Sequence, residues 1–136
     1  MTKQASKLYM GPVPQRLYHG DEVDFHFDAS RQATKCIFFA ARESDARTYA
    51  GAHRRANGHV FTCAVKLGRI AEFANEYELI SYGQGFGEPI IAYRNAGDRL
   101  RADGFDAAVI LDNAAGGTDF VIWDSSLITV LSSEPC

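Results

Sequence analysis

Three side chains that lie far apart in the sequence could take part in chemistry together. They are the imidazole of His19, the phenol ring of Tyr49 and the carboxylate of Asp119. An imidazole and a carboxylate can hold a polar ligand or exchange protons, and a tyrosine ring can stack on a planar group. Each alone also has an ordinary structural interpretation in a core or a turn. The set is informative only if the fold brings the three into one cleft.

Short strands are expected at both ends of the chain. Residues 16–19 form a strand that stops at Gly20, which places His19 at its end. Residues 36–40 are a second β-prone run, and residues 59–67 alternate in polarity as a half-buried strand does. Residues 105–111, 119–123 and 127–131 complete about six strands, with Asp119 at the head of a late one.

Three helices are expected between the early and the late strands. The first runs from a cap at Ser44 to Gly58, and the spacing of Ala46, Tyr49, Ala50 and His53 turns Tyr49 inward. A second covers residues 70–77, and a third covers residues 95–102 and ends before Gly104. The glycine-rich residues 81–87 are expected to form a loop. This order of elements favours the α+β class.

The composition fits one folded domain. The chain has 136 residues, 46% of them hydrophobic and 23% charged, and a net charge of -3 that argues against broad nucleic-acid binding. We expect a flexible arm over residues 1–14 and a single domain over residues 15–136. No apolar run approaches a membrane span and no signal peptide is evident, so a cytoplasmic location is expected, with leaderless secretion left open.

Metal and disulfide chemistry are not expected. The three cysteines lack CxxC spacing, which supports neither a disulfide framework nor a zinc knuckle. The four histidines lack HExxH spacing, so no metal site is predicted. The chain also has no GxGxxG or GxxxxGK[ST] motif for a dinucleotide or phosphate.

Several short motifs, taken in order, resemble a known enzyme family. They are Tyr18-His19-Gly20, Phe38-Phe39-Ala40 followed by Tyr49, and the run from Gly117 to Asp124. This order resembles the His-Tyr-Glu class of ADP-ribosyltransferases, which includes diphtheria-like toxins and poly(ADP-ribose) polymerases, and is most similar to the small transferase domains of phage and bacterial polyvalent proteins. The resemblance implies a compact fold of two small packed β-sheets with about three flanking helices.

The resemblance also implies a role for each matching residue. The catalytic residues would be His19, Tyr49 and Asp119, and NAD would be held by His19, Gly20, Phe38, Ala40 and Tyr49. Phe38 and Tyr49 would enclose the nicotinamide, and Asp119 would stand where the family has a glutamate. Aspartate is one methylene shorter, which is a departure from the family pattern. Asp112 and Asp124 are the other candidates for this carboxylate.

The implied function is NAD-dependent mono-ADP-ribosyl transfer. The nicotinamide–ribose bond of NAD, used as co-substrate, would be cleaved and ADP-ribose passed to a macromolecular acceptor, as toxins and effectors of this class do. The acceptor stays open among protein, nucleic acid and small molecule, with protein slightly favoured. Two alternatives also stay open. One is an NAD glycohydrolase, and the other is a catalytically inactive NAD-binding or interaction module of the same fold.

Overall fold

In its described residues, the chain forms one eight-stranded mixed β-sheet with three α-helices. The computed structural model describes residues 7–53, 58–84, 88–114 and 116–136. In sheet order the strands are β1 (Lys7–Leu8), β5 (Ile70–Phe73), β6 (Ala107–Ile110), β7 (Asp119–Ile122), β3 (Ile37–Ala40), β2 (Leu17–Glu22), β4 (Gly58–Val65) and β8 (Ile128–Pro135). The helices are α1 (Glu43–His53), α2 (Glu76–Gly83) and α3 (Pro89–Ala102). Short 3-10 turns lie at Ala29–Arg31 and Ser125–Leu127.

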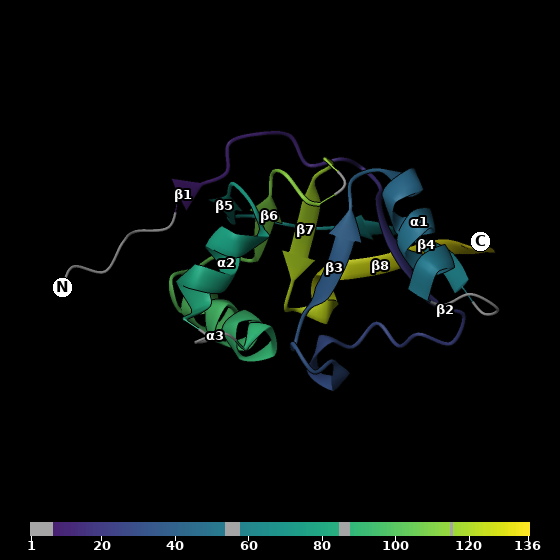
Figure 1. Ribbon diagram of the computed structural model, residues 1–136. Coiled ribbons are helices and arrows are strands. Elements are labelled where there is room, and N and C mark those ends of the chain that lie inside the picture. Colours follow the sequence, from purple (N-terminus) through teal and green to yellow (C-terminus); the bar gives the residue numbers. More distant parts are fainter. Residues whose placement is uncertain (1–6, 54–57, 85–87, 115) are drawn as a thin grey trace.

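The helices cover one face of the sheet. Figure 1 shows α2 and α3 over the β5–β6–β7 half and α1 over the half that contains β2 and β4. Phe38, Val121 and Trp123 pack toward α2 and α3, whereas Ala40 and Val60 pack toward α1. The α+β class with three helices is therefore confirmed for the described part of the chain.

The expectation of two packed sheets is wrong. A single register pair, Tyr18 with Ala40, joins β2 to β3 and makes the sheet continuous. Phe61 and Cys63 of β4 nevertheless share one buried cluster with Ile70 of β5. The sheet therefore curls, so that its two halves lie across a common core although backbone pairing never breaks.

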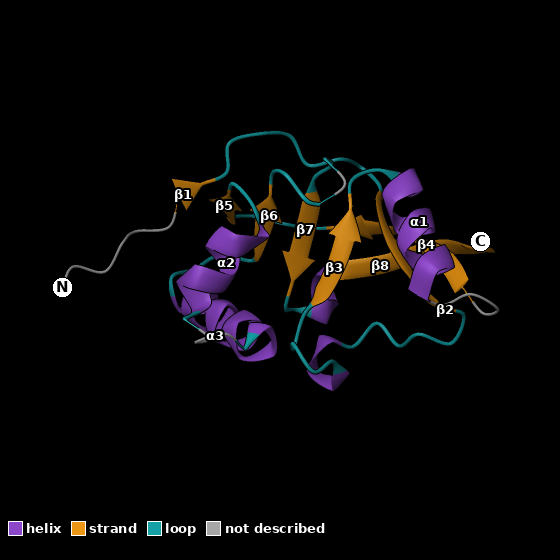
Figure 2. Ribbon diagram, viewed as in Figure 1, coloured by secondary structure: helices purple, strands orange, loops and turns teal. Residues whose placement is uncertain are grey.

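The other face of the sheet is covered by irregular chain. Tyr9, Val13, Phe25 and Phe27 pack on the cluster that contains Phe39. Figure 2 shows the long loop between β2 and β3, with its one short helical turn, at one end of the sheet. Lys7 and Leu8 pair with β5, so part of the expected N-terminal arm belongs to the sheet. Residues 1–6 lie outside the described residues.

Several element boundaries differ from the expectations. Residues 70–73 form β5 and not a helix, and α2 begins after Asn75, whose side chain accepts a hydrogen bond from the Glu78 N–H. Helix α3 begins at Pro89, earlier than expected, and Gly104 follows it with φ +86°. Helix α1 spans Glu43–His53, so Ser44 lies inside it, and Gly58 already belongs to β4. Residues 85–87 of the expected loop lie outside the described residues.

Candidate functional site

A cavity of about 900 Å³ opens where β2 and β3 part. That volume is near the upper end for small-molecule sites. Beyond the register pair Tyr18–Ala40, β2 and β3 are no longer paired with each other. Residues from both faces of the sheet line the cavity. The six residues to which the family resemblance assigned a role all line it: His19, Gly20, Phe38, Ala40, Tyr49 and Asp119.

His19 lies inside β2 and not at its end, because the strand continues to Glu22. Its Nδ1 lies 2.6 Å from the carbonyl oxygen of Phe38, and since a carbonyl can only accept, Nδ1–H is the donor. Its Nε2 lies 3.1 Å from Oδ2 of Asp21. The ring is 8% exposed and contacts Phe25 and the edge of Phe27. The imidazole thus occupies the gap between the diverging strands in a fixed orientation.

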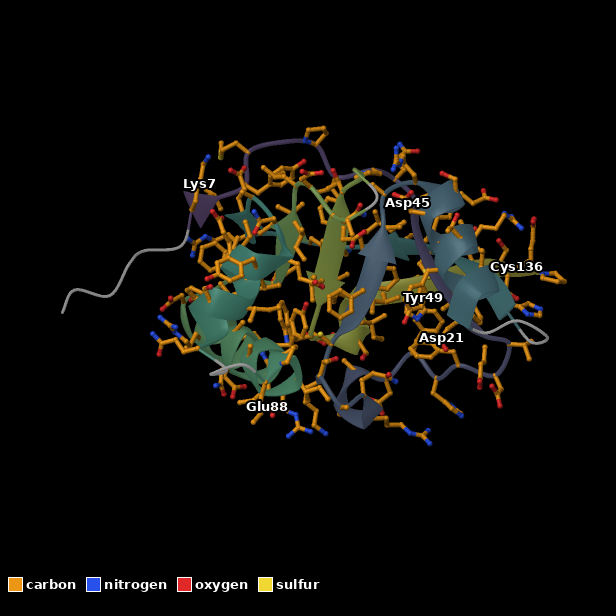
Figure 3. All side chains as sticks on the ribbon, in the orientation of Figure 1. Lys7, Asp21, Asp45, Tyr49, Glu88 and Cys136 are labelled. Atoms are coloured by element: carbon orange, nitrogen blue, oxygen red, sulfur yellow. The ribbon has the colours of Figure 1, made fainter. Side chains whose placement is uncertain are left out.

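Tyr49 is less buried than its helical position predicts. Ala46 and Ala50 face the sheet and are fully buried, whereas Tyr49 is 49% exposed and borders the cavity. Asp45 and Asp21 also line the cavity, and Figure 3 shows them above and below Tyr49 in the part of the molecule that contains α1 and β2. Tyr49 is therefore a side wall of the cavity and not part of the core. The side chain of His53 lies outside the described residues.

Gly20 brings helix α1 close to β2. A Cβ on this residue would lie 2.2 Å from the backbone oxygen of Ala46 and 3.0 Å from Cβ of Ala50. A real Cβ cannot approach a backbone oxygen this closely, so the absence of a side chain lets the helix pack directly on the strand. This close packing is a structural reason for glycine at position 20, in addition to the ligand contact expected from the sequence.

Asp119 brings a carboxylate to the cavity from the head of β7. It pairs in register with Ala40 on β3 and Ile110 on β6. Its Oδ1 accepts a hydrogen bond of 2.9 Å from the side-chain amide of Asn113. Burial raises the pKa of Asp119, the bond from Asn113 lowers it, and the neighbouring carboxylates of Asp45 and Glu76 raise it further. The net effect is a raised pKa.

Neither alternative carboxylate lines the cavity. Asp112 is exposed, and its backbone N–H bonds to the Ala74 carbonyl. Asp124 caps the turn Ser125–Leu127, where its Oδ1 accepts from the backbone N–H and the hydroxyl of Ser126. These bonds lower the pKa of Asp124.

Other lining residues were not anticipated from the sequence. Glu76 accepts a 2.6 Å hydrogen bond from the hydroxyl of Tyr93, and the Tyr93 ring meets Phe38 edge-on with centroids 5.1 Å apart. Burial raises the pKa of Tyr93, and the bond to Glu76 adds to this effect. The Asn75 cap could have identified Glu76 as a first-turn residue. The turn composition around Gly116 and Gly117 could have identified Asn113.

The charged part of the lining is acidic. Among the described residues the cavity is lined by the carboxylates of Asp21, Asp45, Glu76 and Asp119, together with the imidazole of His19, and by no lysine or arginine. A cation or a developing positive charge is therefore favoured in this space.

Within the described residues no group of three or more His, Cys, Asp or Glu side chains could hold a metal ion. No described helix is long and apolar enough to cross a membrane.

The fold is similar to two solved structures. One is a chain of the M. tuberculosis MbcT–MbcA toxin–antitoxin complex. The match covers 97% of this chain and 85% of that chain, with a TM-score of 0.55 and 11% sequence identity. The fold also resembles an anti-CRISPR protein, with a TM-score of 0.50 and 12% identity, over 85% of this chain and 94% of that one. No protein-family model and no curated protein matches the sequence. At such low identity the likeness shows the fold alone, which resembles that of the MbcT toxin.

Proposed function

We propose that this protein is an NAD-dependent mono-ADP-ribosyltransferase that cleaves the nicotinamide–ribose bond and passes ADP-ribose to a macromolecular acceptor. The observation that carries the proposal is the single cavity lined by His19, Phe38, Tyr49 and Asp119, which come from four different elements. The likeness to a toxin–antitoxin complex and to an anti-CRISPR protein is compatible with a toxin- or effector-like role.

The cavity suits the chemistry of glycosidic cleavage. As the bond between the ribose C1′ and the nicotinamide nitrogen breaks, its electron pair stays with nicotinamide and the ribose becomes cationic. The nicotinamide ring of NAD already carries a positive charge, so cleavage moves this charge from the ring to the ribose. The half-buried carboxylate of Asp119, placed beside the ribose, would stabilise the charge there more than in the ground state. An acceptor nucleophile would then bond to C1′ and lose its proton.

The remaining residues would orient NAD. Phe38 and Tyr49 both line the cavity and would offer aromatic surface for the nicotinamide, one from β3 and one from α1. Gly20 and Ala40 lie on the strand segments where β2 and β3 part, beside the nicotinamide position. Both ring nitrogens of His19 have partners, the Phe38 carbonyl at Nδ1 and Oδ2 of Asp21 at Nε2. A ribose hydroxyl bound by His19 would therefore take the place of Asp21 at Nε2.

The decisive measurement is nicotinamide release, followed by NMR, from NAD with the protein alone and with a cell lysate as acceptor source. Asp119→Asn should lower release by about 100-fold or more while NAD affinity, measured by calorimetry, stays within a few-fold. Asp112→Asn is the matched control, since this exposed aspartate lies outside the cavity lining, and it should release nicotinamide normally.

The same assay separates the related reactions. Release that is fast only with lysate, together with an ADP-ribosyl adduct found by mass spectrometry, supports transfer. Equal release with water alone indicates a glycohydrolase. Binding of NAD without any release indicates an inactive module, and normal turnover by Asp119→Asn would refute the assignment of Asp119.

A further inference from the structure

Asn113 is held at both ends of its side chain. It lies in the loop between β6 and β7, where its Oδ1 accepts a 2.8 Å bond from the backbone N–H of Gly117. Because an N–H can only donate, this bond fixes which end of the amide is oxygen. The nitrogen end therefore points to Asp119 and donates to Oδ1 over 2.9 Å.

The loop itself is closed around Asn113. The Asn113 N–H donates to the Gly117 carbonyl over 2.7 Å, and the Gly116 N–H donates to the Asn113 carbonyl over 2.9 Å. Gly116 has φ +79°, a conformation that favours glycine. The hydroxyl of Thr118 bonds to the Leu111 carbonyl and closes the base of the loop. The orientation of the amide is thus set by the turn and does not depend on a bound ligand.

Asp119 sits in surroundings that oppose its ionisation. Among the described residues, the titratable groups that act on it are Asp45 on α1, Glu76 on α2 and Tyr93 on α3, while Ala40 and Ile110 are its partners in register on the paired strands. Asp45 is itself paired with Arg42. Within the described part of the chain, the bond from Asn113 is the one hydrogen bond that the carboxylate of Asp119 accepts.

We propose that Asn113 is a positioning residue for this site: its amide holds Oδ1 of Asp119, favours the ionised form of the carboxylate by donating to it, and leaves Oδ2 for the substrate. This inference rests on the proposed function, because it assigns Asn113 a role in the reaction that Asp119 supports. An anchored carboxylate loses little freedom when the ribose becomes cationic, which is the advantage of a preorganised site.

The sharpest test is Asn113→Asp. Aspartate keeps the size of the side chain and an acceptor for the Gly117 N–H, but it replaces the donated bond with a carboxylate oxygen beside Asp119. The acidic limb of the pH profile of kcat should move to higher pH, with a loss of about tenfold or more at pH 6 that recovers toward pH 9. The KM for NAD should stay within a few-fold. Asn113→Ala, which adds no charge, serves if the aspartate variant does not fold, and it should lower kcat with a smaller displacement of the acidic limb.

Asn95→Asp is the matched control. The Asn95 amide also donates to a neighbour, the carbonyl of Gly83, but Asn95 does not line the cavity. This variant loses a comparable bond, so its pH profile should match that of the wild type. A displaced profile in Asn95→Asp as well would show a general effect of stability and overturn the positioning role of Asn113.

A second readout needs no NAD. The side-chain carboxyl of Asp119, followed by ¹³C NMR during a pH titration, should have a higher midpoint in Asn113→Asp, or in Asn113→Ala, than in the wild type. An unmoved midpoint overturns the role of Asn113 whatever the activity. A moved midpoint in a protein that releases no nicotinamide overturns the proposed reaction, and with it the part assigned to Asn113 in that reaction.

Discussion

Ala40 and Asp119 lie directly opposite each other on the antiparallel strands β3 and β7. Side chains that are opposite in register point to the same face of a sheet, so the carboxylate shares its face with Ala40 and with Phe38 two residues earlier. Ala40 is also the residue that pairs with Tyr18 across to β2. The small side chain of Ala40 therefore lies between the carboxylate and the point where the sheet opens into the cavity.

The exposed ring of Tyr49 leads to a prediction about affinity. Tyr49→Ala removes one aromatic wall and should weaken NAD binding by roughly 3- to 10-fold, whereas Tyr49→Phe keeps the ring and should bind almost normally. Calorimetry with NAD measures both. Tyr77, which is 76% exposed and lies outside the cavity lining, provides the control Tyr77→Ala. Unchanged affinity in Tyr49→Ala would exclude a stacking role for this ring.

Two glycines near α1 should respond to alanine in opposite ways. In Gly20→Ala the new Cβ collides with the Ala46 backbone, and the free energy of unfolding should fall by about 1–3 kcal/mol. In Gly51→Ala, inside α1, the Cβ meets nothing within 4 Å, and the protein should gain about 0.5–1 kcal/mol from helix propensity. Urea unfolding distinguishes the two. Equal stabilities would mean that α1 does not rest on β2 as closely as described.

The raised pKa of Asp119 predicts how stability depends on pH. A carboxyl whose pKa is higher in the folded than in the unfolded state favours folding at low pH, and this contribution is lost as pH rises from the ordinary value of 3.8 through the raised one. Asp119→Asn cannot ionise and can still accept the bond from Asn113. It should therefore be more stable than the wild type at pH 7, and the difference should shrink toward pH 3. Denaturation at both pH values measures this, and a variant that is less stable at pH 7 would contradict the raised pKa.

The three cysteines should differ in reactivity. Cys36 and Cys63 are buried, and burial raises the pKa of each thiol to about 12, whereas Cys136 is exposed. Iodoacetamide reacts with thiolates, so at pH 8 it should label Cys136 within minutes and label the other two only after denaturation. Peptide mass spectrometry locates the labels. Rapid labelling of Cys36 in the native protein would show that the cavity, which it lines, opens to solvent at that wall.

Local pattern was sufficient for much of the secondary structure. Alternation over residues 59–67 predicted a strand whose Phe61 and Cys63 are buried, and Gly104 was correctly expected to follow a helix. The helix predicted over residues 70–77 was wrong for a physical reason. Ile70 and Phe73 match a helical spacing, but they lie in β5, which is buried on both faces and pairs in parallel with β6, so its apolar residues do not alternate.

The sequence by itself determined which side chains could serve a site, because residue types and local periodicity set the element and the face on which each one lies. Whether these side chains meet depended on tertiary structure: the register of β3 with β7, the parting of β2 from β3 and the curl that joins two expected sheets into one. Those features arise from pairing between segments distant in the chain, which no local pattern encodes. The same long-range packing placed Asn113 on Asp119, Glu76 in the cavity lining and Tyr49 at the cavity wall instead of in the core.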